Sequence, residues 1–242
     1  MKGIFNKVAF SFICFVLLLS FAKAEDGNII LENTKYYKTV TYLVNSSNIN
    51  NLPVTYEITE EEYNNANVNE PKASSTIETT YKKMTTSITQ NGSYYRYKNV
   101  LLWKIAPSTR SYDIIGIGFY NSVKVKGSTH FEQYYCYTGG SCYTTTTNYP
   151  QIFSTGAGTS FLLPSGNLSS LKQTFYFDVE KNTTATIIRQ LAAGDYSHAT
   201  SSISQTNSKK YSVNSNGISL NGSIVSYYDN INTATAIWEG TW

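Results

Sequence analysis

Alternation of hydrophobic and polar residues, the pattern of a half-buried β-strand, runs through much of the chain after residue 25. The pattern most clearly predicts a hairpin over residues 76–103, in which two runs of β-favouring residues flank Asn91-Gly92. A two-residue type I′ turn requires positive φ at both central residues, and Asn and Gly adopt that conformation most easily. This turn would place Ile88 opposite Tyr95.

The apolar face of this hairpin changes along its length. Near the tip the apolar face is the one that carries Ile88, whereas near the base Val100 and Leu102 lie on the opposite face. Both strands change at the same level, near Lys82-Lys83 and Asn99-Val100. Because side chains alternate strictly along a strand, such a change requires a bulge or a passage from one core to another. We therefore predict a long, bent hairpin that contributes to two apolar surfaces.

Further strands are predicted wherever a β-favouring run is bounded by turn residues. They cover residues 36–44, 53–58, 113–120, 123–125, 130–137, 161–163, 175–179, 185–191, 211–213, 217–220, 223–228 and 233–238. One short helix near residues 60–66 is expected after a capping box formed by Thr59 and Glu62. The fold class is therefore all-β, an antiparallel β-sandwich or a barrel-like domain with about a dozen strands.

Several stretches interrupt the alternation. Residues 154–160 are expected to form a polar loop, and residues 192–199 break the strand pattern. Asn221-Gly222 is expected to turn the last hairpin. In the predicted central strand, Gly116 and Gly118 leave a bare strip of backbone, which either a neighbouring aromatic ring or a ligand would cover.

The first 24 residues have the composition of a secretory signal peptide. Two lysines begin an apolar run that is short for a membrane span, and small residues follow where a signal peptidase cleaves. We predict a signal peptide at 1–24 and a single all-β domain at 25–242. The protein is expected to be secreted or extracellular, with no transmembrane segment after cleavage.

Removal of the signal peptide changes the charge balance. Of 19 basic and 16 acidic side chains, three lysines and no acids lie within residues 1–24, so the mature domain is neutral. A neutral domain gives no electrostatic reason to expect nucleic acid as a partner.

Cys136 and Cys142 are the two cysteines of the predicted mature chain, and Thr138-Gly139-Gly140 between them is a turn sequence. In an exported protein such a pair predicts a disulfide. A three-residue turn would place the two cysteines directly opposite each other, within bridging distance. The small ring would stabilise the fold modestly and make the tip of the hairpin rigid.

Tyrosine is abundant near two predicted hairpin tips. Adjacent tyrosines on a strand point to opposite faces, so some of them must be exposed, and exposed rigid aromatics are common where proteins bind carbohydrates or other proteins. The alternative is that tyrosine serves as amphipathic packing in a polar sheet. The candidate binding residues are Tyr94, Tyr95, Tyr97, Tyr135, Tyr137 and Tyr143.

Candidate catalytic groups are few. If His130, Glu132, Asp195 and His198 came together they would form a metal or acid/base site, but histidines at unrelated positions are more often structural. Glu60-Glu61-Glu62 suits the first turn of a helix better than a metal ion. Carboxylate pairs for glycoside hydrolysis remain open among Glu57, Glu78, Asp113, Glu132 and Asp178. No metal, no cofactor and no particular catalytic residue is predicted.

Three functions are compatible with these residues. The favoured hypothesis is a secreted, non-enzymatic binding or surface-assembly domain that recognises a glycan, the cell wall or another protein through exposed tyrosines. The second is a secreted hydrolase that uses a carboxylate pair or His130 and His198. The third is a β-pore-forming protein with Ser/Thr-rich inserting segments, although no segment shows the sustained alternation of a lipid-facing strand.

Overall fold

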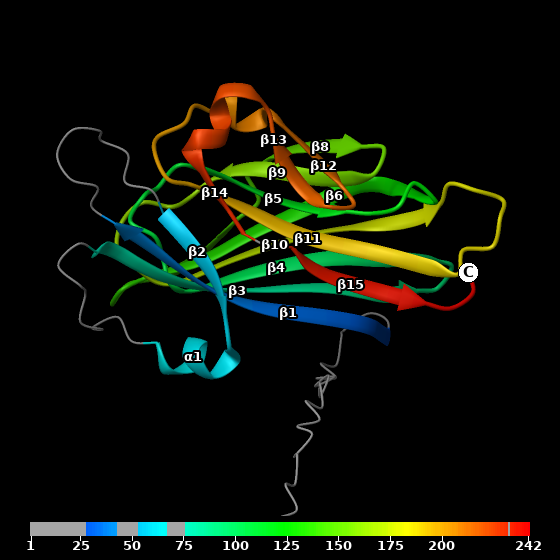
Figure 1. The fold of residues 1–242 in the computed structure, drawn as a ribbon, viewed down its shortest axis with the longest axis horizontal. Coiled ribbons are helices and arrows are strands. Elements are labelled where there is room, and N and C mark those ends of the chain that lie inside the picture. The colour runs from blue at the N-terminus through cyan, green and yellow to red at the C-terminus, as the bar shows by residue number, and fades with distance from the viewer. Residues whose placement is uncertain (1–27, 43–52, 67–75, 232) are drawn as a thin grey trace, which may run out of the picture.

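A computed structural model describes residues 28–42, 53–66, 76–231 and 233–242. The predicted signal peptide at 1–24 lies outside the described residues. The described chain forms two antiparallel sheets that stack on each other and do not close into a barrel (Figure 1). The prediction of an all-β sandwich is therefore confirmed, with fifteen strands in place of about a dozen.

The larger sheet has seven strands in the order β2-β1-β3-β4-β10-β6-β7. These are β2 (Pro53–Ile58), β1 (Asn28–Tyr42), β3 (Thr76–Asn91), β4 (Tyr94–Ile105), β10 (Leu168–Lys181), β6 (Val123–Tyr137) and β7 (Cys142–Thr145). The order places β10 between β4 and β6, so strands that are distant in sequence are neighbours in one layer.

The smaller sheet follows the order β14-β11-β5-β9-β8, and β15 pairs with β11 beside β14. Its strands are β14 (Tyr228–Asn230), β11 (Arg189–Ala199), β5 (Tyr112–Gly118), β9 (Gly156–Leu162), β8 (Tyr149–Phe153) and β15 (Ala234–Glu239). A separate hairpin of β12 (Tyr211–Asn214) and β13 (Gly217–Leu220) covers the outside of this sheet. The helical turns are α1 (Glu60–Asn65), η1 (Asn207–Lys209) and η2 (Gly222–Tyr227).

The main core lies between the two stacked sheets. Alternate residues of β10, among them Phe175 and Phe177, meet Ile115 and Ile117 of β5 and the following residue Phe119 in one buried cluster. The rings of Phe119 and Phe177 meet edge to face, with centroids 5.8 Å apart. The period-2 pattern of the sequence thus becomes the inner faces of two sheets.

The predicted hairpin at 76–103 is present as β3 and β4, but its turn begins one residue later. Asn91 pairs with Tyr94, so Gly92 and Ser93 form the two-residue turn. Gly92 has a φ of 63°. A glycine with positive φ at the first central position is the requirement of a type II′ turn, which competes with type I′ in two-residue hairpins.

The later turn shifts the register of the hairpin by two residues. Ile88 pairs with Tyr97, whereas the sequence predicted Tyr95. A shift of two leaves every side chain on its predicted face, because side chains repeat with period 2.

The predicted change of apolar face is wrong. One face of the hairpin is buried from tip to base and carries Ile88, Met84, Lys82, Tyr95, Tyr97, Asn99, Leu101 and Trp103. Lys82 and Asn99, at the level where the change was predicted, are fully buried polar side chains. The register shifts between Tyr81 and Lys82, which is the bulge that the sequence offered as one of two alternatives. It marks the place where the hairpin contributes to a second apolar cluster.

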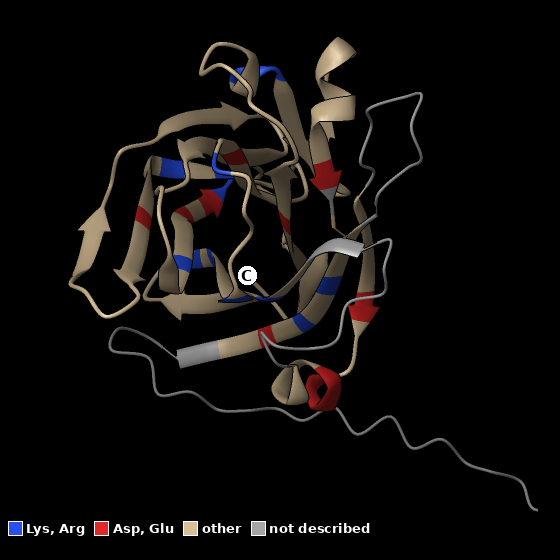
Figure 2. Cartoon of the chain, turned by 90° about the vertical axis from the view of Figure 1, so that its left-hand side faces the viewer, with Lys and Arg blue, Asp and Glu red and all other residues tan. Residues whose placement is uncertain are grey.

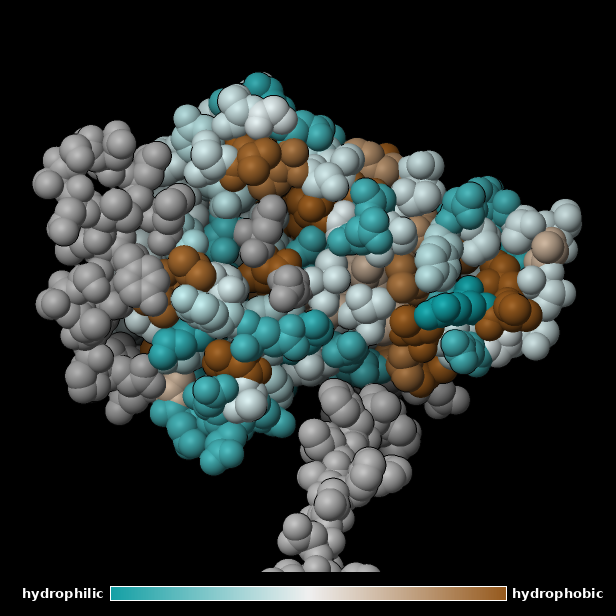
Figure 3. Space-filling model, in the orientation of Figure 1, coloured by the Kyte–Doolittle hydropathy of each residue, from teal (hydrophilic) through white to brown (hydrophobic). Residues whose placement is uncertain are grey.

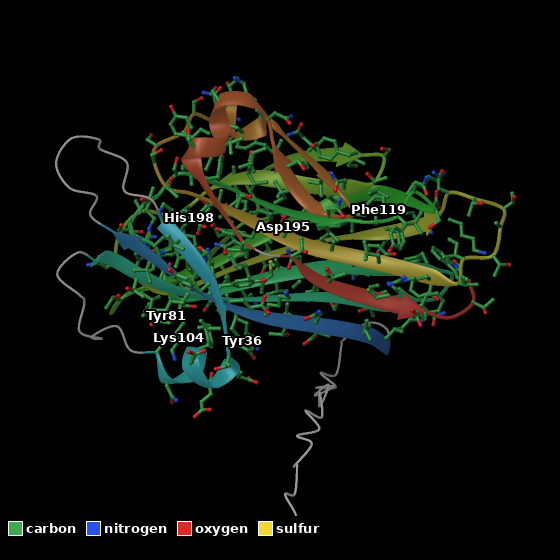
Figure 4. All side chains as sticks on the ribbon, viewed as in Figure 1. Tyr36, Tyr81, Lys104, Phe119, Asp195 and His198 are labelled. Carbon is green, nitrogen blue, oxygen red and sulfur yellow. A yellow bond between two sulfur atoms is a disulfide. The ribbon has the colours of Figure 1, made fainter. Side chains whose placement is uncertain are left out.

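That second cluster lies on the outer face of the larger sheet, beneath α1. Tyr81 packs there with Tyr63 of α1, whose ring is 5.1 Å from that of Tyr36. Lys104 donates hydrogen bonds to the carbonyls of Tyr63 and Asn64, the last turn of the helix. Figure 4 shows Tyr36, Tyr81 and Lys104 gathered at α1. The capping box of Thr59 and Glu62 is present as predicted.

Four glycines form a flat patch on the outer face of the smaller sheet. Gly116 pairs with Gly158, and Gly118 pairs with Gly156. The β12–β13 hairpin lies directly on them: a Cβ at Gly116 would lie 3.1 Å from a methyl of Val213, and one at Gly118 would overlap the carbonyl of Asn214. The hairpin therefore covers the predicted bare strip, with aliphatic side chains and backbone over Gly116 and Gly118, while the ring of Tyr211 lies against Gly158.

Strand positions differ from the prediction in the second half of the chain. Residues 156–162 and 189–199 are strands buried on almost every residue, so their small side chains show no alternation. Residues 182–188 are a loop where 185–191 was predicted as a strand. The last hairpin turns between Asn214 and Gly217, and η2 replaces the strand predicted at 223–228.

We expect Gly118→Ala to lower the free energy of unfolding by about 2 kcal/mol or more, because the new methyl group would force β12–β13 off the sheet. Gly127→Ala is the matched control. A Cβ at Gly127 meets no atom within 4 Å, although its φ is 75°, so it should cost only about 1 kcal/mol. Urea unfolding of both variants checks the difference. Equal losses would contradict the packing of β12–β13 on the glycine patch.

Candidate functional site

The disulfide hairpin carries a cluster of three tyrosines. Cys136 and Cys142 are bonded and lie opposite each other at the ends of β6 and β7, as predicted. The amide of Tyr137 donates to the carbonyl of Ser141 across the three-residue loop, in which Gly139 has a φ of 66°. The disulfide therefore closes the hairpin directly beneath its tip.

The rings of Tyr135, Tyr137 and Tyr143 touch one another, and we call these three residues the tyrosine cluster. Tyr135 and Tyr143 pair across the two strands and stack with centroids 5.7 Å apart, while Tyr137 meets each of them edge to face. Tyr143 is 50% exposed, and the other two are half-buried. Burial and the neighbouring hydroxyls of Tyr137 and Tyr143 raise the pKa of Tyr135.

The cluster continues the inner face of the larger sheet beyond its covered part. Phe131, two pairs before Tyr135 on the same face of β6, packs against Phe161 of the smaller sheet with centroids 4.5 Å apart. Past Gln133, which donates to the carbonyl of Leu162, the inner face opens to solvent. A hydrogen bond between Thr138 and Asn167 holds the tip to the loop before β10.

The surroundings of the cluster are uncharged. Between Gln133 and Leu171 the sequence contains no Asp, Glu, Lys, Arg or His, whereas Ser, Thr, Asn and Gly are frequent. The side chains of Thr144, Thr146 and Thr147 beside the hairpin are exposed. Aromatic rings among neutral hydroxyl and amide groups form a surface that favours an uncharged polar ligand.

The other predicted tyrosines do not form such a surface. Tyr95 and Tyr97 are only 3% and 0% exposed, because their face of β4 points into the core. The hydroxyl of Tyr97 donates to Gln190 of the smaller sheet, and Tyr95 packs on Trp242. Of these three candidate binding residues, Tyr94 alone is partly exposed.

A row of cations and aromatic rings lies on the outer face of the larger sheet. Tyr176 is stacked on His130 with centroids 4.8 Å apart, and the Arg96 guanidinium lies 4.8 Å from the same ring. Lys126 lies 4.3 Å from the ring of Tyr94. Arg96 also forms an ion pair with Asp178, at 2.9 Å. The charged residues on this row balance one another in part, so the row is a less specific candidate than the tyrosine cluster.

The four residues of the predicted acid/base site do not come together. His130 is exposed on the outside of β6, beside Glu132. His198 is buried on the inner face of β11, and Asp195 lies on the opposite face of that strand. Figure 4 shows Asp195 and His198 at separate places along β11. The structure therefore offers no joint site of His130 and His198.

A buried polar cluster that we did not predict surrounds His198. Its Nδ1 lies 3.0 Å and 3.1 Å from the two carboxylate oxygens of Asp113, which also accepts from the hydroxyl of Tyr196 and the amide of Ala199. Burial and the adjacent Asp113 raise the pKa of Tyr196 well above its ordinary value. The indole of Trp103 packs edge to face on the imidazole, with centroids 5.4 Å apart.

Lys82 and Asp229 complete this cluster. The Lys82 ammonium is 0% exposed, 3.3 Å from Oδ2 of Asp229 and 5.0 Å from the Trp103 ring. Asp229 also accepts hydrogen bonds from Thr39 and Thr55. Burial lowers the pKa of Lys82, although Asp229 and Asp113 oppose that shift. Lys82 is followed by a second lysine, Lys83, so the local sequence gives no signal of such burial.

Other features of the surface give weaker indications of a functional site. Within the described residues no group of three His, Cys, Asp or Glu side chains is placed to hold a metal ion, and the glutamates of α1 lie on its exposed first turn (Figure 2). A groove of about 580 Å³ is lined by residues 121–122 and 182–189, at the end of β6 opposite the disulfide. In Figure 3 the hydrophobic residues of the visible face form separate patches among polar ones. No helix in the described ranges is long and apolar enough to cross a membrane.

Comparisons with known proteins give little guidance. No family model matches the sequence, and no curated protein matches it. Among solved structures, the collagen binding domain of the Erysipelothrix rhusiopathiae surface protein RspB aligns over 68% of this chain and 67% of that chain. The sequence identity is 7% and the TM-score is 0.27.

Asp195 should make stability depend on pH. Burial raises its pKa to about 7, although the amides of Tyr196 and Ile218 donate to its carboxylate at 2.7 Å and 2.6 Å. Between the ordinary pKa of about 3.9 and that value, the folded state binds more protons than the unfolded state. The contribution of Asp195 to stability is therefore fully present below about pH 4 and is lost as the pH rises towards 7.

We expect the free energy of unfolding of the wild type to fall relative to that of Asp195→Asn across this range, by up to about 4 kcal/mol. Denaturant unfolding of both proteins at pH values from 4 to 8 measures the difference. The Asn variant keeps the size of the side chain and an oxygen that can accept from Ile218, so it removes mainly the titration. A difference that does not change with pH would contradict the raised pKa.

Proposed function

We propose that this protein is an extracellular, non-enzymatic binding domain that recognises an uncharged glycan through the tyrosine cluster. The observation that carries the proposal is the contact of three tyrosine rings on a disulfide-closed tip, with one ring half exposed. Tyrosine buries a large area at low entropic cost because it has few rotatable bonds, and its hydroxyl can bond polar ligands.

The chemistry around the cluster favours a glycan over a charged partner. Sugar rings present C–H faces that stack on aromatic rings and hydroxyl groups that bond to Ser, Thr and Asn. The neutral stretch from Gln133 to Leu171 supplies these groups without charges that would select an acidic or basic ligand. Ring contacts fix the cluster before binding, which reduces the entropy lost when a ligand binds.

An extracellular location is part of the proposal. A disulfide persists in an oxidising compartment, and the bond between Cys136 and Cys142 supports export. The composition of residues 1–24 supports a secretory signal. A cell-surface or cell-wall glycan is therefore the ligand class to test first.

We expect Tyr143→Ala to weaken glycan binding at least tenfold, because the exposed ring is the part of the cluster that a ligand reaches first. Binding to a panel of neutral cell-surface and wall glycans, measured by calorimetry for each glycan retained, checks this. Tyr227→Ala is the matched control, since Tyr227 is 41% exposed on η2, outside the cluster. Binding that both variants retain, or that a protein partner shows instead, would overturn the glycan assignment.

The disulfide should matter more for binding than for folding. Its two cysteines are six residues apart, so the bond closes a small ring and constrains the unfolded chain little. We expect Cys136→Ser/Cys142→Ser to keep the thermal unfolding temperature within a few degrees of the wild type and to weaken glycan binding. Unchanged binding would show that the rings are held without the disulfide.

A further inference from the structure

We propose that Lys82 and Asp229 are joined by an intramolecular amide bond that forms after the chain folds. The bond would link β3 of the larger sheet to β14 of the smaller sheet, between residues 147 positions apart. This inference is independent of the proposed binding function, because it concerns the interior of the sandwich and not the tyrosine cluster.

The surroundings of Lys82 suit an amide nitrogen better than an ammonium ion. An ammonium carries three N–H donors, and each needs an acceptor when water is excluded. Lys82 is fully buried, and among the described residues its single hydrogen-bond acceptor is Oδ2 of Asp229 at 3.3 Å. The Trp103 ring provides the remaining contact. An amide nitrogen keeps only one N–H, so condensation would remove the unmatched donors.

Burial also prepares the two groups to react. An amine attacks a carboxyl carbon only in its neutral form, and desolvation lowers the pKa of Lys82. Transfer of a proton from the ammonium to the Asp229 carboxylate gives a neutral amine and a neutral acid, the pair that a low-dielectric interior favours. The 3.3 Å contact of Nζ with Oδ2 places the amine beside the carboxyl group that it would attack.

Hydrogen-bond donors already surround the carboxyl group of Asp229. The Thr55 hydroxyl lies 2.8 Å and 2.6 Å from its two oxygens, and the Thr39 hydroxyl lies 3.3 Å from Oδ2. During attack one oxygen of the tetrahedral intermediate carries negative charge, and hydroxyl donors at this distance stabilise it. In the product, the remaining carbonyl oxygen keeps Thr55 as a partner.

His198 is the group placed to move protons. It pairs with Asp229 on the neighbouring strand, so the two side chains lie side by side on one face of the sheet. Its Nδ1 is held by Asp113, which leaves Nε2 to accept a proton from the attacking nitrogen and to return it to the departing oxygen. His198 and Lys82 also both pack on the ring of Trp103.

The reaction balances without any further reagent. The C–N bond forms between Nζ of Lys82 and Cγ of Asp229, and one C–O bond of the carboxyl group breaks. The ammonium loses two protons, and the departing oxygen takes both and leaves as water. Neither residue is oxidised or reduced.

The experiment is mass spectrometry of the wild-type protein, expressed from the full chain, reduced and digested with trypsin. We expect one branched peptide that joins the segments around Lys82 and Asp229, lighter than their sum by one water molecule, with no cleavage after Lys82. Lys82→Met and Asp229→Ala, denatured before digestion, give the unlinked reference. Recovery of the separate, unmodified peptides from the folded wild type would overturn the proposal and leave an ordinary buried ion pair.

A time course tests the role of His198. We expect His198→Ala to form the linked species about 100-fold more slowly than the wild type when both are followed by mass spectrometry from the time of their synthesis at neutral pH. Asp113→Asn, which keeps the size of the side chain, should also slow the reaction by leaving the imidazole unoriented. Linkage at the wild-type rate in both variants would show that His198 and Asp113 take no part in the reaction. The amide bond itself is tested separately, by the mass spectrometry of the tryptic peptides.

Discussion

Polar side chains that cross the interior of the sandwich fix how its two sheets lie on each other. Asn99 of the larger sheet donates to the backbone carbonyls of Gly116 and Asp195 in the smaller sheet, and Tyr97 reaches Gln190 in the same way. A hydrophobic core alone tolerates sliding, whereas a buried polar group without its partner costs free energy. The contact also needs Gly194, since a Cβ there would collide with Thr86 and Asn99.

The separation in sequence between interacting residues explains which parts of the fold could be predicted. The fold class, the disulfide hairpin and the side of the sheet to which each side chain points follow from local periodicity and turn chemistry. They are therefore unaffected by the two-residue error in the predicted register. The change of face in the 76–103 hairpin was wrong because Lys82 and Asn99 resemble surface residues in sequence. Asp229 of β14, the partner of Lys82, and Asp195 of β11, one partner of Asn99, lie more than ninety positions later in the chain. No local pattern indicates a partner at that distance.

The tyrosine cluster could be predicted from the sequence, whereas the buried polar cluster could not. Tyr135, Tyr137 and Tyr143 lie close in sequence on one hairpin, so their proximity could be inferred from the two cysteines. The cluster of Asp113, His198, Lys82 and Asp229 draws on four strands of two sheets and had no signal in the sequence. Tyr95 and Tyr97 were candidates for a binding surface because tyrosine carries a polar hydroxyl. The hydroxyl of Tyr97 instead finds its partner in the core.

The short disulfide hairpin has a further consequence for how molecules of this protein meet. β7 is the edge of the larger sheet and has only four residues. An edge strand offers unpaired backbone groups to any extended chain, and native proteins limit that risk with short strands and prolines. β2, the opposite edge of that sheet, begins at Pro53, and β8, an edge of the smaller sheet, contains Pro150. A rigid, abbreviated edge of this kind discourages strand-to-strand aggregation in a protein rich in exposed threonine and tyrosine.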